Sequence, residues 1–126
     1  MHLFEYATIR FVPRVERDEF VNVGVILFCS AKSYLRTVYE LNETRMRALC
    51  SKIDIAEVEE RLAAFEKICS GGKAAGPIGE MPRASRFRWL TANRSTIIQT
   101  SPVHPGLCEL PEETMQSLFA KLVSYT

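Results

Sequence analysis

The stretch from Phe20 to Cys29, FVNVGVILFC, constrains most strongly what this chain can fold into. Successive residues of a strand point to opposite faces, so one face of this segment is fully apolar and carries Val21, Val23, Val25, Leu27 and Cys29. The other face carries Phe20, Asn22, Gly24, Ile26 and Phe28. Because both faces are mostly apolar, we expect both to be covered, and the sequence predicts a central strand of a sheet.

Other segments have the composition of strands. Leu3 to Val12 is rich in aromatic and β-branched residues, and Pro13 ends it. Ser33 to Glu40 is a third strand, reached by a short turn. Arg86 to Leu90 and Ser95 to Thr100 are expected to form a hairpin with the turn between them. The sequence therefore predicts an antiparallel meander of three strands, followed later by a hairpin.

Three helices are expected beside these strands. Asn42 and Asp54 are capping residues, and each precedes apolar residues at helical spacing. Pro111 opens a last helix at its first turn. We therefore expect a single domain over residues 1–126 of the α+β class, with an antiparallel sheet of about five strands and three helices packed on one face. Residues 70–82, which are rich in glycine, are expected to form a flexible loop.

The net charge is +1, which excludes a polycation built for nucleic acid over its whole surface. The longest apolar run, Val23 to Cys29, is too short to cross a membrane. The first residues, MHLFEY, lack a basic start and an apolar signal core. We therefore expect a cytoplasmic protein without a membrane partner.

The cysteines do not have the spacing of a metal site. They are Cys29, Cys50, Cys69 and Cys108, and no two of them form a C-x-x-C pair. His104 and Cys108 are close in sequence, but two ligands do not make a site. We expect reduced thiols at apolar positions, no metal and no cofactor.

Residues 81–108 contain no acid, and their cations are Arg83, Arg86, Arg88, Arg94 and His104. Guanidinium groups offer a planar donor fork that suits phosphate or carboxylate. The last four of these cations are therefore the candidate residues for binding a phosphate or nucleic-acid anion. Two alternatives remain open. The arginines form a solvated strand face while Phe87 and Trp89 enter the core, or they pair with acids elsewhere.

A second set of candidates lies in the central strand and the hairpin. Gly24 leaves a notch beside Asn22, where either a ligand or a bulky neighbour approaches. We expect this notch to meet Ser95. Ser95, Ser101 and His104 have side chains suited to catalysis, but no G-x-S-x-G or comparable motif fixes them in place. No catalytic residue is assigned.

The segment DEFVNVGVILF (18–28), followed downstream by RFRWLTANRSTIIQTSPVHPG (86–106) and a short C-terminal helix, resembles the bacterial domain of unknown function 3037 family. The resemblance covers nearly the whole chain. It implies no known activity, because the family has none established. Genes of that family are often found beside those for HipA-like kinases, which implies a toxin–antitoxin or regulatory setting and a kinase-like protein partner.

Three functions follow from these patterns. The first is a non-enzymatic module that binds a partner protein, because no catalytic constellation is evident. The second is a phosphate or nucleic-acid binder that uses the arginines of residues 83–104. The third is a hydrolase or nuclease-like enzyme at His104, Ser95 and Asn22, which needs a cleft that joins the two signature segments. The sequence leaves the oligomeric state open.

Overall fold

The computed structural model describes residues 1–94 and 96–124. Within them the strands are β1 (His2–Phe11), β2 (Val21–Cys29), β3 (Tyr34–Tyr39), β4 (Ile98–Thr100) and β5 (His104–Cys108). The α-helices are α1 (Glu43–Leu49), α2 (Ile55–Ser70), α3 (Gly76–Gly79), α4 (Arg83–Leu90) and α5 (Pro111–Leu122). The short 3-10 helices are η1 (Val15–Arg17), η2 (Ser30–Lys32) and η3 (Lys73–Ala75). The α+β class is confirmed.

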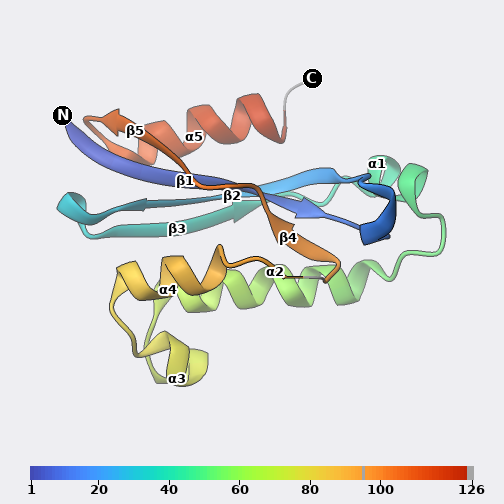
Figure 1. Cartoon of the computed structure of the whole chain (residues 1–126), viewed down its shortest axis with the longest axis horizontal. Coiled ribbons are helices and arrows are strands. Elements are labelled where there is room, and N and C mark those ends of the chain that lie inside the picture. The colour runs from blue at the N-terminus through green and yellow to red at the C-terminus, as the bar shows by residue number, and fades with distance from the viewer. Residues whose placement is uncertain (95, 125–126) are drawn as a thin grey trace.

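All strand pairs that the structure describes are antiparallel. One edge of β1 pairs with β2, and β3 pairs with the far edge of β2, so the predicted meander is confirmed. The other edge of β1 is shared, because β5 pairs with its first half and β4 with its second half. Figure 1 shows how β4 and β5 return along the long first strand. The described part of the chain therefore forms a five-stranded antiparallel sheet, as the sequence predicts, but one of its strands is β5 and not the expected Arg86–Leu90.

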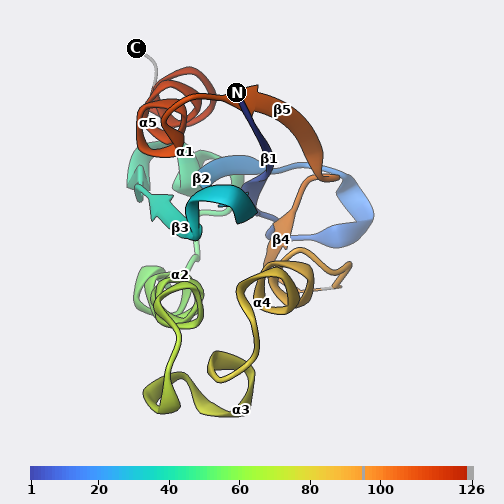
Figure 2. The same cartoon turned by 90° about the vertical axis from the view of Figure 1, so that its left-hand side faces the viewer.

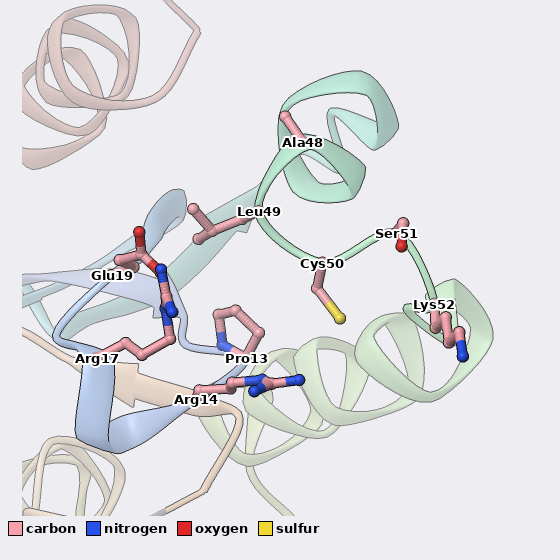
Figure 3. A pocket seen from close by; sticks show the side chains of 9 residues that line it. All are labelled: Pro13, Arg14, Arg17, Glu19, Ala48, Leu49, Cys50, Ser51 and Lys52. Carbon is pink, nitrogen blue, oxygen red and sulfur yellow. The ribbon is translucent and has the colours of Figure 1, made fainter.

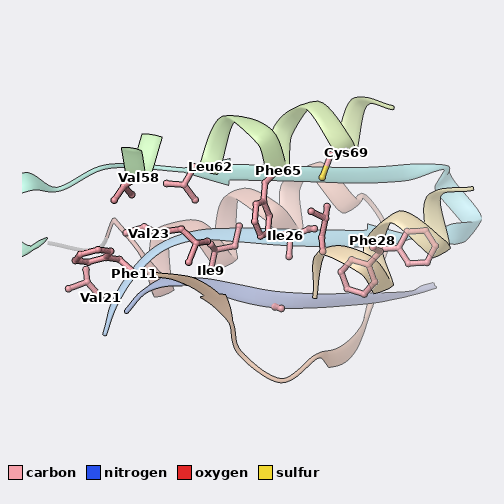
Figure 4. Packing of buried hydrophobic residues seen from close by; sticks show 14 of the residues in the cluster. Ile9, Phe11, Val21, Val23, Ile26, Phe28, Val58, Leu62, Phe65 and Cys69 are labelled. Carbon is pink, nitrogen blue, oxygen red and sulfur yellow. The ribbon is translucent and has the colours of Figure 1, made fainter. Parts of the chain in front are cut away.

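Helices cover both faces of this sheet, whereas the sequence analysis placed three helices on one face. In Figure 2, α2 and α4 lie on one side of the sheet and α5 lies on the other. Under α2 and α4 the buried cluster includes Ile9, Ile26, Leu62, Phe65 and Phe87 (Figure 4). Under α5 the cluster is Phe4, Val25, Leu27, Cys29, Cys108, Met115 and Val123. The one-face arrangement is wrong because β2 is apolar on both faces, and each face needs its own cover.

A β-bulge distributes the apolar residues of β2 between these two clusters. The register between β1 and β2 shifts between Ile9 and Arg10. Val23 therefore joins the cluster under α2, while Val25 joins the cluster under α5. The five apolar residues that simple alternation placed on one face of β2 therefore lie on both faces of the sheet. The same shift places Asn22 opposite Arg10 on the α5 face.

The hairpin predicted for Arg86–Leu90 and Ser95–Thr100 is wrong, because Arg83–Leu90 is the helix α4. The alternation of arginine with Phe87 and Trp89 resembles the polar and apolar alternation of a strand. The buried positions of α4 are Arg86, Phe87 and Leu90, which is the spacing of a helix face. Phe87 packs on Phe28 at 5.4 Å between ring centroids, whereas Trp89 is 42% exposed.

The glycine-rich segment after α2 contains η3 and α3. The N–H of Gly72 donates to the carbonyl of Gly79 at 2.8 Å, which closes this segment on itself. Asn42 and Asp54 cap α1 and α2 as predicted, accepting from Arg45 N at 3.1 Å and Glu57 N at 3.2 Å. In the described ranges, no helix has the length and apolar character needed to cross a membrane.

Candidate anion-binding site

Arg86, the first predicted anion ligand, is buried and joins two helices. It donates from Nη1 to the carbonyl oxygens of Ile68 and Cys69, at 2.8 and 2.7 Å, and from Nε to that of Met81, at 2.9 Å. The carbonyls at the end of a helix lack partners within that helix and carry partial negative charge. Arg86 therefore serves as a cap for α2, and the side chain is only 7% exposed.

Arg88 and His104 lie on opposite faces of the sheet. Arg88 makes a two-pronged ion pair with Glu5, with N–O distances of 2.7 and 3.0 Å. His104 is the cross-strand partner of Tyr6, and the two ring centroids are 5.3 Å apart. Because Glu5 and Tyr6 are consecutive in β1, their side chains point to opposite faces. The sheet therefore separates Arg88 from His104.

Arg94 closes the end of α4. Its Nη1 donates to the carbonyl of Leu90 at 3.2 Å, and its Nη2 donates to the carbonyl of Trp89. The guanidinium carbon lies 4.3 Å from the centroid of the Trp89 ring. Each of the predicted arginines therefore has its own protein partner, and the structure does not bring the four candidate residues to one patch.

The second set of candidates is also dispersed. The space where a Cβ on Gly24 would lie is taken by the carbonyl of Val38, 2.8 Å away, and by Tyr39, so the notch meets β3 rather than a ligand. Asn22 donates from Nδ2 to the carbonyl of Leu122 at 3.1 Å and thereby ties β2 to the end of α5. Ser95 lies outside the described residues. The strand β4, which follows it, pairs with β1 and not with β2.

Ser101, the other catalytic candidate, is buried and holds the backbone. Its Oγ accepts from Thr8 N at 2.9 Å and donates to the carbonyl of Pro102 at 2.9 Å. Ser101 is only 4% exposed, and these hydrogen bonds join β1 to the segment before β5. A pocket lined by Asp18, Phe20 and Gln99 does join the two signature segments, but its lining includes none of the candidates Asn22, Ser101 and His104.

A different pocket gathers cations at one end of the sheet. It has a volume of about 480 Å³, and Figure 3 shows its lining side chains. These are Pro13, Arg14, Arg17, Glu19, Ala48, Leu49, Cys50, Ser51 and Lys52. Two parts of the chain form the pocket: the connector between β1 and β2, which contains η1, and the end of α1 with the connector between α1 and α2. We call it the connector pocket.

The connector pocket carries an excess of positive charge. It is lined by three cations and one acid. Arg17 pairs with Glu19 at 2.5 Å, and this hydrogen bond lowers the pKa of Glu19. Among the ion pairs of the described residues, none includes Arg14 or Lys52. Two exposed cations therefore flank the pocket with their charges uncompensated.

The arrangement suits reversible binding of an anion. A guanidinium offers two parallel donors to a phosphate or carboxylate, and an ammonium adds a flexible point charge. Ser51 adds an exposed hydroxyl at the same rim, and Figure 3 shows the Cys50 thiol directed to the side on which Arg14 lies. No group of three His, Cys, Asp or Glu residues in the described segments is placed to hold a metal ion.

The comparison with protein families gives a match over almost the full length. A family model described as protein of unknown function (DUF3037) matches residues 6–123. The chain belongs to this family. No curated protein and no solved structure matches it. The DUF3037 match includes both connectors of the pocket.

The sequence analysis drew no candidate residue from the connector PRVERDE (13–19) and so missed this pocket. One signal was available. The outer strands of a three-stranded meander run in the same direction, so the connectors that follow β1 and β3 leave from the same end of the sheet. The sequence places Arg14 and Arg17 in one of these connectors. It does not show that Lys52, beyond α1, turns back toward them.

Proposed function

We propose that this domain is a non-catalytic binding module that holds an anionic group in the connector pocket. The observation that carries the proposal is the pair of uncompensated cations, Arg14 and Lys52, on opposite connectors of a 480 Å³ pocket. Two cations that face the same space repel each other, and a bound anion relieves that repulsion. Arg17, which also lines the pocket, is held by Glu19.

The shared chemistry of the ligand is a phosphate or carboxylate group. One source is a phosphorylated or acidic segment of a partner protein, such as the kinase-like partner that the family resemblance implies. The other source is free phosphate or pyrophosphate. An extended nucleic-acid backbone is a poorer fit, because the molecule as a whole has a net charge of only +1.

The proposal is tested by calorimetric titration with pyrophosphate at low and moderate salt. Arg14→Ala and Lys52→Ala should each weaken binding about tenfold, because each removes a charge-assisted contact worth roughly 1.5 kcal/mol. Arg83→Ala is the matched control, since Arg83 is an exposed arginine at the start of α4 and does not line the pocket. It should leave binding unchanged.

A variant that should strengthen pyrophosphate binding complements this test. Glu19→Gln removes the only acid that lines the pocket and releases the Arg17 guanidinium. Pyrophosphate binding should become tighter in this variant. Equal affinities for the wild type, Arg14→Ala, Lys52→Ala and Glu19→Gln would overturn the proposal.

The source of the anion is distinguished by two further probes. A peptide with one phosphoserine should bind more tightly than inorganic phosphate if the pocket serves a protein partner, because the peptide adds contacts along the rim. The unphosphorylated peptide is the control. Equal affinity for the phosphopeptide and for inorganic phosphate indicates a free-anion site instead.

A further inference from the structure

A second pocket uses other residues of the β1–β2 connector. Its volume is about 260 Å³, and its lining residues are Arg10, Val12, Val15, Asp18, Phe20 and Gln99. Arg10 lies opposite Asn22 in the sheet register, and Asn22 contacts the end of α5. The pocket is therefore built beside Arg10 on the α5 face of the sheet. It shares no lining residue with the connector pocket.

Arg10 has hydrogen-bonding capacity that the protein does not use. Its Nε is buried and has no hydrogen-bond partner, and no acid in the described residues lies within ion-pair distance of its guanidinium. The Oδ1 of Asn22, the residue directly opposite, is also buried without a partner. Buried polar atoms are rarely left unpaired, so unpaired atoms in two facing residues need an explanation.

An aromatic ring holds the guanidinium in place. The guanidinium carbon of Arg10 lies 4.1 Å from the centroid of the Phe20 ring, and Phe20 is 43% exposed. A large exposed aromatic side chain stacked with an arginine offers a flat surface to a planar ligand. Such platforms bind bases in proteins that recognise single-stranded nucleic acid.

The remaining walls indicate a neutral ligand with both donors and acceptors. Asp18 offers acceptor oxygens, and it balances the charge of Arg10 within the pocket. The Nε2 of Gln99 donates a hydrogen bond to the carbonyl of Thr96 at 3.0 Å, so its Oε1 remains to accept a hydrogen bond from a ligand. Val12 and Val15 supply apolar contact. The volume is below the roughly 300–1,000 Å³ of pockets for drug-sized molecules, which favours a single ring system.

From these features we infer that this pocket binds a nucleobase, which stacks against Phe20 and Arg10 and forms hydrogen bonds with Gln99 and Asp18. The base belongs either to a free nucleoside or to a short single strand. This site is independent of the anion-binding function, because an uncharged base does not need the cations of the connector pocket.

The probes are the four common ribonucleosides, which carry no phosphate and so do not test the connector pocket. At millimolar concentration, at least one of them should shift the backbone amide NMR signals of Arg10, Phe20 and Gln99. Phe20→Ala should weaken that binding about fivefold or more, because stacking on an aromatic side chain contributes that much for a single base. Phe20→Trp should restore it, since the flat ring is kept.

Gln99→Ala should also weaken the binding, whereas Leu107→Ala, at a 62% exposed position on β5 that does not line the pocket, should not. A short oligonucleotide and its abasic counterpart separate the two sources of the base. Stronger shifts from the oligonucleotide than from both the nucleoside and the abasic strand indicate a single strand as the ligand. The inference is overturned if neither nucleosides nor the oligonucleotide shift these amides beyond the abasic strand, or if folded Phe20→Ala responds like the wild type.

Discussion

Arg86 donates a hydrogen bond of 2.7 Å to the main-chain oxygen of Cys69 and so joins the start of α4 to the end of α2. Gly71, at φ 79°, passes beside this contact, and a Cβ there would lie 2.7 Å from Nη1 of Arg86. The arginine and the glycine therefore depend on each other. The glycine-rich connector is tied to the core by a buried cation and not by apolar packing alone.

Replacing Arg86 by Met should destabilise the fold by about 3 kcal/mol, because three carbonyl oxygens lose a charged donor while the apolar volume is largely kept. Arg86→Lys should recover only part of this loss, since an ammonium cannot reproduce the fork. Urea unfolding measures both variants. A loss well below about 1 kcal/mol for Arg86→Met would show that the contact is not a structural cap.

Glu112 should make the stability of the protein depend on pH in the acid range. Partial burial raises the pKa of Glu112, but hydrogen bonds from Tyr34, Arg36 and Gln116 outweigh it and hold the pKa at about 2. A carboxylate whose pKa is lower in the folded state makes its full contribution to the stability of the fold when the pH is above its unfolded-state pKa of about 4.3. This contribution is lost as the pH falls toward the folded-state pKa of about 2.

Thermal melting of Glu112→Gln against the wild type between pH 2 and pH 6 measures this contribution. The wild type should be the more stable protein at pH 6, and the difference should shrink at acid pH. The side chain is 47% exposed, so moderate salt should reduce the difference. Parallel curves for the two proteins across this range would contradict the prediction.

One thiol should react much faster than the others in the native protein. The cysteines of the described segments are all free; Cys29, Cys69 and Cys108 are buried, and Cys50 is half-buried in the wall of the connector pocket. Burial raises the pKa of the Cys69 thiol to about 11, which further slows its reaction. A thiol reagent should therefore label Cys50 first, and pyrophosphate should slow that labelling.

Cys50→Ser supplies the control for this labelling, because it should remove the fast phase and leave the slow ones. A fast phase that persists in Cys50→Ser, or a rate that pyrophosphate does not change, would count against an anion beside Cys50.

The strands β1, β2 and β3 could be predicted because they carry their own signal, whereas β5 was missed and the expected strand Arg86–Leu90 is a helix. β2 is apolar on both sides, and that pattern indicates a central strand wherever the helices lie. The bulge at Ile9 and Arg10 could not be predicted in this way, because simple alternation assumes one residue for each pairing step. The single apolar face expected for β2 was therefore split between two cores.

The arginine-rich segment shows why composition misled the site prediction. Arg86 and Arg88 are two residues apart, so a strand would place them on one face, whereas α4 turns them to different partners. The absence of acids between residues 81 and 108 suggested uncompensated charge. The compensation comes instead from helix-end carbonyls and from Glu5, which are distant in sequence. Only the folded chain shows that Arg14 and Lys52, neither of which belongs to an ion pair of the described segments, line the same pocket.

The most direct test of the anion-binding account is an NMR titration of the wild type with pyrophosphate, followed residue by residue. The account predicts saturable shifts in the amides of Arg14, Ser51 and Lys52, which weaken with salt, and no comparable shifts in those of Arg88 and Arg94. Shifts centred on Arg88 and Arg94, or no saturable shift at Arg14 and Lys52, would contradict it.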